Sequence, residues 1–267
     1  MRIGFRYRRR GMLDPILTAK RAEVARMLAG PRHLAVSEPG GGVLEALARP
    51  SGDPFRWIAH VSIRRRPRDD ERASEGEDAD EASSPPPPSE ESPSARAIRA
   101  AKNGAAAVWI PTDELFTGGS YAHLRRCRDA LDAAFGDRRP RIIGEDVLVA
   151  PVQLDRAAGA GADAVLLIAK ALAPSSLSAL VEAARRLGLE PIVEAASDAE
   201  IERAVLAGAR VIAATARDRD TGKIDAERPR VVLSRGPPRR RRALPGHSIR
   251  RRRGRARNHP CGRGNRG

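Results

Sequence analysis

Ionisable side chains stand at or near the ends of three apolar segments that have the length of β-strands. Glu194 belongs to the segment 190–195, and Glu145 belongs to the segment 141–146. His60 lies within a third segment of this kind. A carboxylate can serve as a general base, and a histidine, whose unperturbed pKa is about 6.5, can serve as an acid or a base. Because the active sites of β/α barrels lie where the strands end, we favour a site position for Glu194 over a solvated carboxylate.

His60 and Glu145 each have an alternative explanation that involves packing or pairing only. A histidine near the end of a strand can simply be packed there, and we favour this explanation for His60. Glu145 is ionised at pH 7 unless burial raises its pKa. It is either a new catalytic group or the ion-pair partner of an arginine in residues 64–66, and we favour the ion pair.

The clearest structural signal is the alternation of apolar runs and helical spacing within residues 159–221. Three apolar runs of strand length alternate with two segments of helical spacing, in the order 162–169, 175–187, 190–195, 198–206 and 209–216. Continuous apolar runs suit strands that are buried on both faces, and a repeated strand–helix–strand order implies parallel pairing. The sequence therefore predicts an α/β fold with a parallel sheet.

Further elements of the same two kinds precede this stretch. The predicted helices are 12–28, 95–103, 121–135 and 151–158, and the predicted strands are 55–63, 105–110 and 141–146. Lys20 and Arg21 interrupt the apolar stripe of the first helix, although their aliphatic stems could still cover apolar surface. The count gives six β/α units after a leading helix, which fits either an open doubly wound sheet or most of a (β/α)₈ barrel.

The charge distribution divides the chain into a near-neutral body and a basic tail. The net charge is +15, but residues 231–267 contain thirteen arginines and no acidic residue or lysine, which leaves +2 for residues 1–230. We therefore expect a folded domain over residues 1–230 and a disordered arginine-rich tail. Within the domain, the acidic and proline-rich segment 69–94 cannot bury enough apolar surface to offset its ordering entropy, so we expect a disordered insert.

Several classes of protein are disfavoured by what the sequence lacks. No run of about 18 apolar residues suggests a membrane span, and the basic N-terminus is not followed by the apolar stretch of a signal peptide. Cys127 and Cys261 fit neither a disulfide framework nor a four-ligand zinc site. We therefore expect a cytoplasmic protein with no membrane partner and no metal or other cofactor.

Several motifs, in a consistent order over residues 12–228, resemble the indole-3-glycerol-phosphate synthase family. They are MLDPILTAKRAEVARM, FRWIAHVSIRRRP, NGAAAVWIPTDELFTGGSYAHL, PRIIGEDVLVAPVQLDRAAGAGADAVLLIAKAL and LGLEPIVEAASDAEIERAVLAGARVIAATARDRDT. The resemblance implies a (β/α)₈ TIM barrel with an additional N-terminal helix, which we expect to be incomplete or irregular after the sixth strand. It also implies a lyase of tryptophan biosynthesis, which closes the indole ring of a carboxyphenylamino-deoxyribulose phosphate with loss of carbon dioxide and water.

Four positions that act in catalysis or binding in this family are substituted. The family's first strand carries a glutamate and a lysine where this chain has His60 and Ser62. The family's third-strand lysine, its general acid, is replaced by Glu145, and its sixth-strand asparagine is replaced by Thr215. Loss of a general acid typically costs about 10²–10⁴-fold in rate. The Ser-Pro-Ser motif that helps to hold the substrate phosphate is also absent after the first strand.

Four other positions match the family. Glu194 aligns with the general base, and Arg217 aligns with the arginine that follows the sixth strand. Asp113 and Ser120 match an acidic residue and the serine of a Gly-Ser pair after the second strand, so the resemblance implies that they bind substrate. The alternative for Arg217 is an ordinary loop arginine.

Three functional hypotheses remain open. The first is a lyase by descent that acts, with impaired activity, on the family's phosphorylated small-molecule substrate. The second, which we favour on physical grounds, is a pseudoenzyme that has lost the lysines and the phosphate site. The third is nonspecific nucleic-acid binding through the arginine-rich tail, which would depend steeply on salt. The change in composition after residue 230 fits either a genuine tail or translation of a shifted reading frame.

Overall fold

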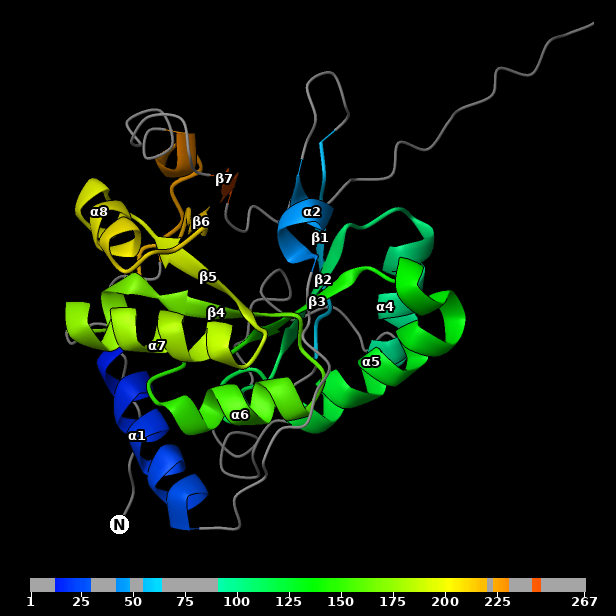
Figure 1. Cartoon of the computed structure of the whole chain (residues 1–267), viewed down its shortest axis with the longest axis horizontal. Helices are drawn as coiled ribbons and strands as arrows, with labels where there is room; N and C mark the ends of the chain where they lie inside the picture. Colours follow the sequence, from blue (N-terminus) through cyan, green and yellow to red (C-terminus); the bar gives the residue numbers. More distant parts are fainter. Residues whose placement is uncertain are drawn as a thin grey trace, which may run out of the picture.

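A curled parallel β-sheet forms the centre of the molecule. The computed structural model describes residues 13–29, 42–48, 55–63, 91–219, 223–230 and 242–245, the last of these by backbone alone. The strands are β1 (Ile58–His60), β2 (Ala107–Pro111), β3 (Arg141–Glu145), β4 (Ala164–Ile168), β5 (Glu190–Ala195), β6 (Val211–Ala214) and β7 (Arg242–Pro245). They pair in chain order, every pair is parallel, and helices cover the outer face (Figure 1). This order is that of a TIM barrel, so the expected incomplete TIM-barrel-like α/β fold is confirmed.

Most of the predicted helices lie within two residues of their expected bounds. They are α1 (Leu13–Ala29), α4 (Pro93–Lys102), α5 (Tyr121–Phe135), α6 (Pro151–Gly159), α7 (Pro174–Arg186) and α8 (Asp198–Leu206), with short 3₁₀ turns η1 (Gly136–Arg138) and η2 (Ala169–Ala171). The short helix α2 (Val43–Leu47) and strand β7 were not predicted. Residues 64–90, which include most of the expected insert, and the remainder of the expected tail lie outside the described residues.

Serine caps and first-turn prolines begin the helices that follow the strands. Ser92, Ser120 and Ser197 each accept a hydrogen bond from the backbone N–H three residues further on. This bond satisfies one of the donors that a helix leaves unpaired at its start. The residues around each serine therefore specify where α4, α5 and α8 begin. These helices begin near the carboxyl end of the sheet.

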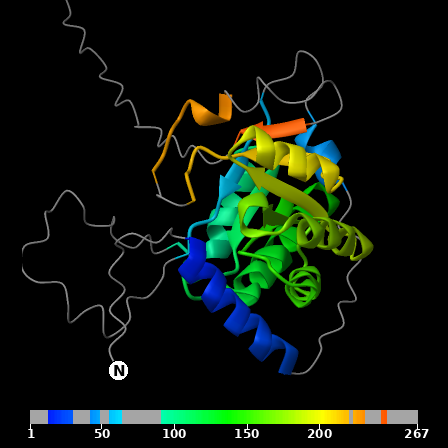
Figure 2. The same ribbon diagram turned by 90° about the vertical axis from the view of Figure 1, so that its left-hand side faces the viewer.

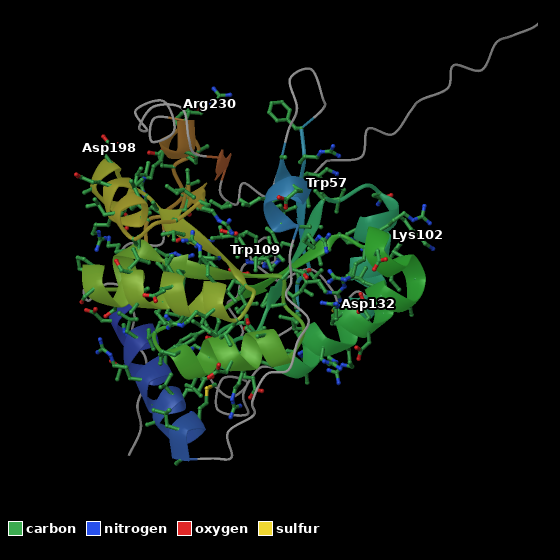
Figure 3. The ribbon with its side chains drawn as sticks, in the orientation of Figure 1. Trp57, Lys102, Trp109, Asp132, Asp198 and Arg230 are labelled. Carbon is green, nitrogen blue, oxygen red and sulfur yellow. The ribbon has the colours of Figure 1, made fainter. Side chains whose placement is uncertain are left out.

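The buried side chains form two clusters that the sheet separates. Along β2, Val108 and Ile110 face the cluster beneath the outer helices, whereas Ala107 and Trp109 face the cluster enclosed by the curled sheet. This alternation is the period of two that a strand imposes. Figure 3 shows Trp109 among the strands and Trp57 beside β1, and Trp57 is 41% exposed.

The two helices that precede β1 lie at opposite ends of the molecule (Figure 1, Figure 2). Helix α2 packs at the amino end of the sheet, where Val43 and Leu47 join the enclosed cluster. Helix α1 lies at the carboxyl end, because its Lys20 contacts the residues that follow β2 and β3. The N-terminal helix therefore packs at the end of the sheet where the candidate site residues lie.

Candidate functional site

Four ionisable side chains meet at the carboxyl end of the sheet, which we call the mouth. The imidazole Nε2 of His60, at the end of β1, lies 3.1 Å from Oε2 of Glu145, at the end of β3. Glu194 of β5 binds Arg219, from the loop after β6. Arg219 is also close enough to Glu145 for the two charges to attract. The structure thus brings together three of the predicted site residues and one arginine that was not predicted.

Arg219 holds Glu194 with two hydrogen bonds. Nε donates to Oε1 at 2.7 Å, and Nη2 donates to Oε2 at 2.6 Å, which is the strong bidentate arrangement. The Glu194 side chain is only 3% exposed, and that of Arg219 is 25% exposed. Burial disfavours the charged guanidinium, but the hydrogen bonds to Glu194 and the charges of Glu194 and Glu145 raise the pKa of Arg219 overall. A ligand that approaches Glu194 would therefore have to compete with Arg219 for its two oxygens.

The backbone next to Arg219 is held by antiparallel pairing of residues 216–218 with residues 223–225. The backbone N–H of Asp218 donates to the carbonyl of Lys223 at 2.8 Å, and that of Asp225 donates to Ala216 at 2.9 Å. Arg217, the arginine that matches the family, is exposed, and its backbone N–H donates to Thr215 Oγ1 at 3.2 Å. The side chain that reaches Glu194 is therefore that of Arg219, two residues after the position singled out from the sequence.

The remaining predicted site residues have local structural partners. The exposed Ser62 accepts a hydrogen bond from Arg96 through its backbone carbonyl, and the buried Thr215 accepts from the backbone of Arg217. Ser120 caps α5. The preceding Gly119 admits no side chain, because a Cβ would lie 2.1 Å from the carbonyl oxygen of Pro111. Ser120 is thus held close to the end of β2. The expected arginine partners of Glu145, in residues 64–66, lie outside the described residues.

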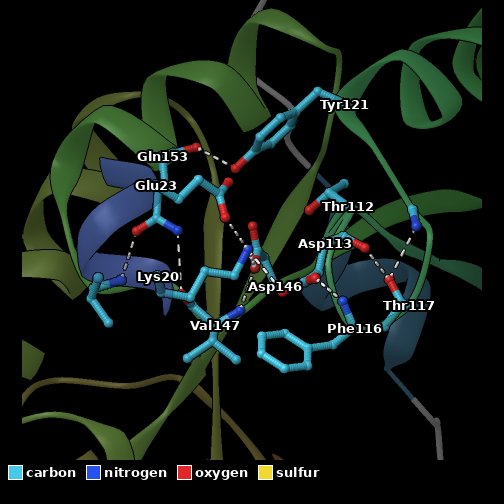
Figure 4. A network of polar contacts seen from close by, with 12 residues as sticks. Lys20, Glu23, Thr112, Asp113, Phe116, Thr117, Tyr121, Asp146, Val147 and Gln153 are labelled. Atoms are coloured by element: carbon cyan, nitrogen blue, oxygen red, sulfur yellow. Dashed lines mark hydrogen bonds and ion pairs between the residues drawn. The ribbon is translucent and has the colours of Figure 1, made fainter. Parts of the chain in front are cut away.

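A second polar cluster, the Lys20 network, lies where α1 crosses the ends of β2 and β3 (Figure 4). The Lys20 side chain is 0% exposed. Its Nζ lies 2.8 Å from Glu23 Oε2, 2.8 Å from Asp113 Oδ2 and 2.7 Å from Asp146 Oδ1. A lysine ammonium has three N–H donors, and all three have a carboxylate here. Asp113 thus has a structural ion pair at the position where the family resemblance implies substrate binding.

The pKa values of Lys20 and Asp146 are both raised, but for different reasons. Burial disfavours the charged ammonium, but Asp146, Asp113 and Glu23 raise the pKa of Lys20 overall. Burial raises the pKa of Asp146 to about 6 despite Lys20, and the nearby Asp113 and Glu23 charges add to this. Asp146 Oδ2 has no hydrogen-bond partner among the described residues. One carboxylate of this network therefore titrates close to neutral pH.

The burial of Lys20 was not predicted, because a lysine interrupts the apolar stripe of its helix. The buried positions of α1 are Leu13, Lys20, Val24 and Met27, which share one helical face. A lysine in the middle of such a face must bury its ammonium or displace the helix, and a buried ammonium needs carboxylate partners. The need for a carboxylate partner could therefore have been predicted from the sequence, whereas only the fold shows that Asp113 and Asp146 provide it.

The described residues show neither a metal-binding cluster nor a membrane-spanning helix. They contain no group of three or more His, Cys, Asp and Glu residues placed to hold a metal ion. None of their helices has the length and apolar character that crossing a membrane requires.

Comparison with known proteins identifies the family. The family model for indole-3-glycerol phosphate synthase matches residues 86–242, which is more than half of the chain. Indole-3-glycerol phosphate synthase 1 of Streptomyces coelicolor is 40% identical over 122 residues, covering 46% of this chain and 43% of the relative. The synthase of Streptomyces griseus is 38% identical over 133 residues, covering 50% and 47%. That of Aquifex aeolicus is 36% identical over 124 residues, covering 46% of each chain. The chain thus spans somewhat less than half the length of these curated relatives, and it belongs to the indole-3-glycerol phosphate synthase family of tryptophan biosynthesis.

Proposed function

We propose that this member of the family is a pseudoenzyme, in which the TIM-barrel-like fold persists but ring closure is lost or severely impaired. The observation that carries the proposal is the bidentate pair between Arg219 and Glu194. Glu194 is the position at which the family resemblance implies the general base. A substrate would have to compete with this guanidinium for both oxygens of the glutamate, which opposes proton transfer to it.

The positions of the acids support the same proposal. Ring closure requires protonation of a carbonyl and of a departing hydroxyl, for which the family resemblance implies lysines. Ser62 and Glu145 occupy the two lysine positions, and the Ser62 side chain has neither a charge nor a suitable pKa. Glu145 binds His60 at 3.1 Å, so this carboxylate is also engaged.

The charge at the mouth opposes the family's substrate. Glu145 and Glu194 bring two negative charges, and Arg219 brings one positive charge, so the four mouth residues sum to −1 when His60 is neutral. The family's substrate carries a carboxylate and a phosphate. Glu145 and Glu194 would repel these like charges.

Complementation tests this proposal. The gene would be expressed in a tryptophan auxotroph that lacks indole-3-glycerol phosphate synthase, beside an E194Q variant and an intact synthase. We expect no growth from either form, while the soluble fraction contains folded protein. Growth that the E194Q substitution abolishes would show that the site still works and would contradict the proposal.

The arginine-rich tail supports a second candidate function, which is nonspecific binding of nucleic acid. Residues 231–267 carry thirteen arginines, and such a charge density gives affinity that falls steeply with salt. Deletion of residues 246–267 would remove eight of these arginines and keep the residues of β7. Binding of a single-stranded oligonucleotide should fall sharply in the truncated chain, and unchanged binding would exclude the tail.

A further inference from the structure

We propose that Lys20 is a positioning residue, through which the N-terminal helix α1 holds Glu145 in place at the mouth. Lys20 itself lies outside the mouth and touches none of its four residues in the contacts described above. Its effect on Glu145 passes through the ends of two neighbouring strands. The inference concerns the protein without substrate, so it does not depend on whether ring closure is lost.

The first step is the backbone contact that fixes Glu145. The backbone N–H of Thr112 donates to the carbonyl oxygen of Glu145 at 2.8 Å. The hydroxyl of Thr112 donates to the same carbonyl at 3.3 Å. The position of Glu145 therefore depends on how the end of β2 lies against the end of β3.

The second step is the bridge that Lys20 makes immediately beyond this contact. Asp113 follows Thr112 and Asp146 follows Glu145, and both carboxylates bind the ammonium of Lys20. The two strand ends are thus joined once by a backbone hydrogen bond and again, one residue further on, by a buried lysine. Loss of the lysine would leave two buried carboxylates facing each other without their shared cation, and like charges would push the strand ends apart.

The third step is the alternation of side chains at the end of β3. Successive residues of a strand point to opposite faces, so Glu145 and Asp146 can serve two different partners. Glu145 reaches His60 on β1, whereas Asp146 reaches Lys20 on α1. Asp146 also accepts a hydrogen bond from the backbone N–H of Val147 at 2.7 Å, which fixes its orientation. One short segment therefore connects the helix to the mouth.

Lys20 is also a principal attachment of α1. Its face buries three apolar residues, namely Leu13, Val24 and Met27, with Lys20 between them. The ion pairs of Lys20 to Asp113 and Asp146 connect the helix directly to the strand ends. Removal of the ammonium should therefore loosen α1 and the mouth together, whereas other parts of the sheet stay protected.

The test compares K20M with R139M in the full chain. Arg139 makes a buried ion pair with Asp163 at the amino end of the sheet, so R139M controls for the loss of a buried cation elsewhere. Two readouts are needed, namely hydrogen exchange of the α1 amides and the ring ¹⁵N signals of His60. The E145Q variant supplies the His60 signals expected when the negative charge of Glu145 is lost.

In K20M, we expect the α1 amides to exchange at least about tenfold faster while the β4 and β5 amides keep their protection. The His60 signals should move towards their positions in E145Q. In R139M, neither change should occur.

If K20M leaves the His60 signals at their wild-type positions, or if it changes exchange in the same regions as R139M does, Lys20 is structural only and the proposal is wrong. If K20M does not fold, D113N removes one of the three carboxylates, and the same two readouts decide with smaller shifts.

Discussion

Buried ion pairs connect each end of β3 to the end of a neighbouring strand, but the two sets of ion pairs differ in charge balance. At the amino end, Arg139 binds Asp163 through two hydrogen bonds of 2.5 and 2.9 Å. At the carboxyl end, Lys20 binds Asp146 at 2.7 Å and Asp113 at 2.8 Å. Both sets of ion pairs bring charged side chains that are far apart in sequence into the interior.

The amino-end cluster is complete, whereas the carboxyl-end cluster is not. Arg128 and Arg139 face Asp132 and Asp163, so two positive charges meet two negative charges, and both oxygens of Asp163 accept hydrogen bonds. The Lys20 network sets one ammonium against three carboxylates. One Asp146 oxygen is buried and has no partner among the described residues. A cluster in which positive and negative charges balance is typical of a structural role. A cluster with excess negative charge and a carboxylate of shifted pKa is typical of a functional site.

Substitution of Lys20 should have the largest effect on stability. K20M leaves three carboxylates without their cation, and breaking a buried ion pair in this way costs about 3–5 kcal/mol in free energy of unfolding. Urea denaturation at pH 7.5 measures it. The loss should shrink at about pH 5, because the carboxylates can then take up protons. A loss below about 1 kcal/mol would show that the network contributes little to stability.

The pH dependence of stability should reveal Asp146. Its pKa is raised from 3.8 to about 6 in the folded chain, so the folded state keeps this proton at a pH at which the unfolded state has lost it. The stability that this group contributes is therefore complete below about pH 4 and is lost as the pH rises to about 6, by roughly 3 kcal/mol.

The D146N variant isolates this contribution, because asparagine does not titrate. The difference in unfolding free energy between wild type and D146N should fall as the pH rises from about 4 to about 7. A constant difference over this range would contradict the raised pKa of Asp146.

At the mouth, substitution of Arg219 should have an intermediate effect. R219L leaves the buried Glu194 carboxylate without its partner, and because Arg219 is partly exposed we expect a loss of about 2 kcal/mol. The exposed Arg217 is the matched control, and R217L should change stability by less than R219L does. Thermal unfolding of both variants measures the difference, and equal effects would show that the Glu194 pair is weak.

The smallest effect is expected at the His60–Glu145 contact. Both side chains are partly exposed, at 28% and 22%, so water screens the pair. E145Q should change the free energy of unfolding by less than about 1 kcal/mol. A larger loss in urea denaturation would mean that Glu145 supports the sheet as well as the mouth.

The sequence predicts the repeating part of the fold well, because the strands and helices there have local sequence signals that mark where they begin and end. β5, α5 and α8 have the predicted bounds, since apolar runs, serine caps and glycine or alanine ends coincide. The short α2 and β7 were missed because neither has enough residues to show a period. β7 is defined by its backbone pairing with β6, which is a tertiary contact.

The candidate site was predicted in its positions but not in its partners. Glu194, Glu145 and His60 do lie together, because the ends of parallel strands share one edge. The partner of Glu194 was not identified, because alignment with the family points to Arg217 and only the three-dimensional structure shows that Arg219 reaches Glu194. Lys20 depends on contacts with residues about one hundred positions away, which no local pattern contains.

The proposed loss of ring closure is tested most directly by measuring turnover of the purified chain. The substrate is carboxyphenylamino-deoxyribulose phosphate, and formation of the indole product is followed by its fluorescence, with an intact synthase as the positive control. Wild type and E194Q should both give the rate of the protein-free control. Turnover by wild type that is lost in E194Q would contradict the proposed loss of function, because Glu194 would then be acting as a base despite Arg219.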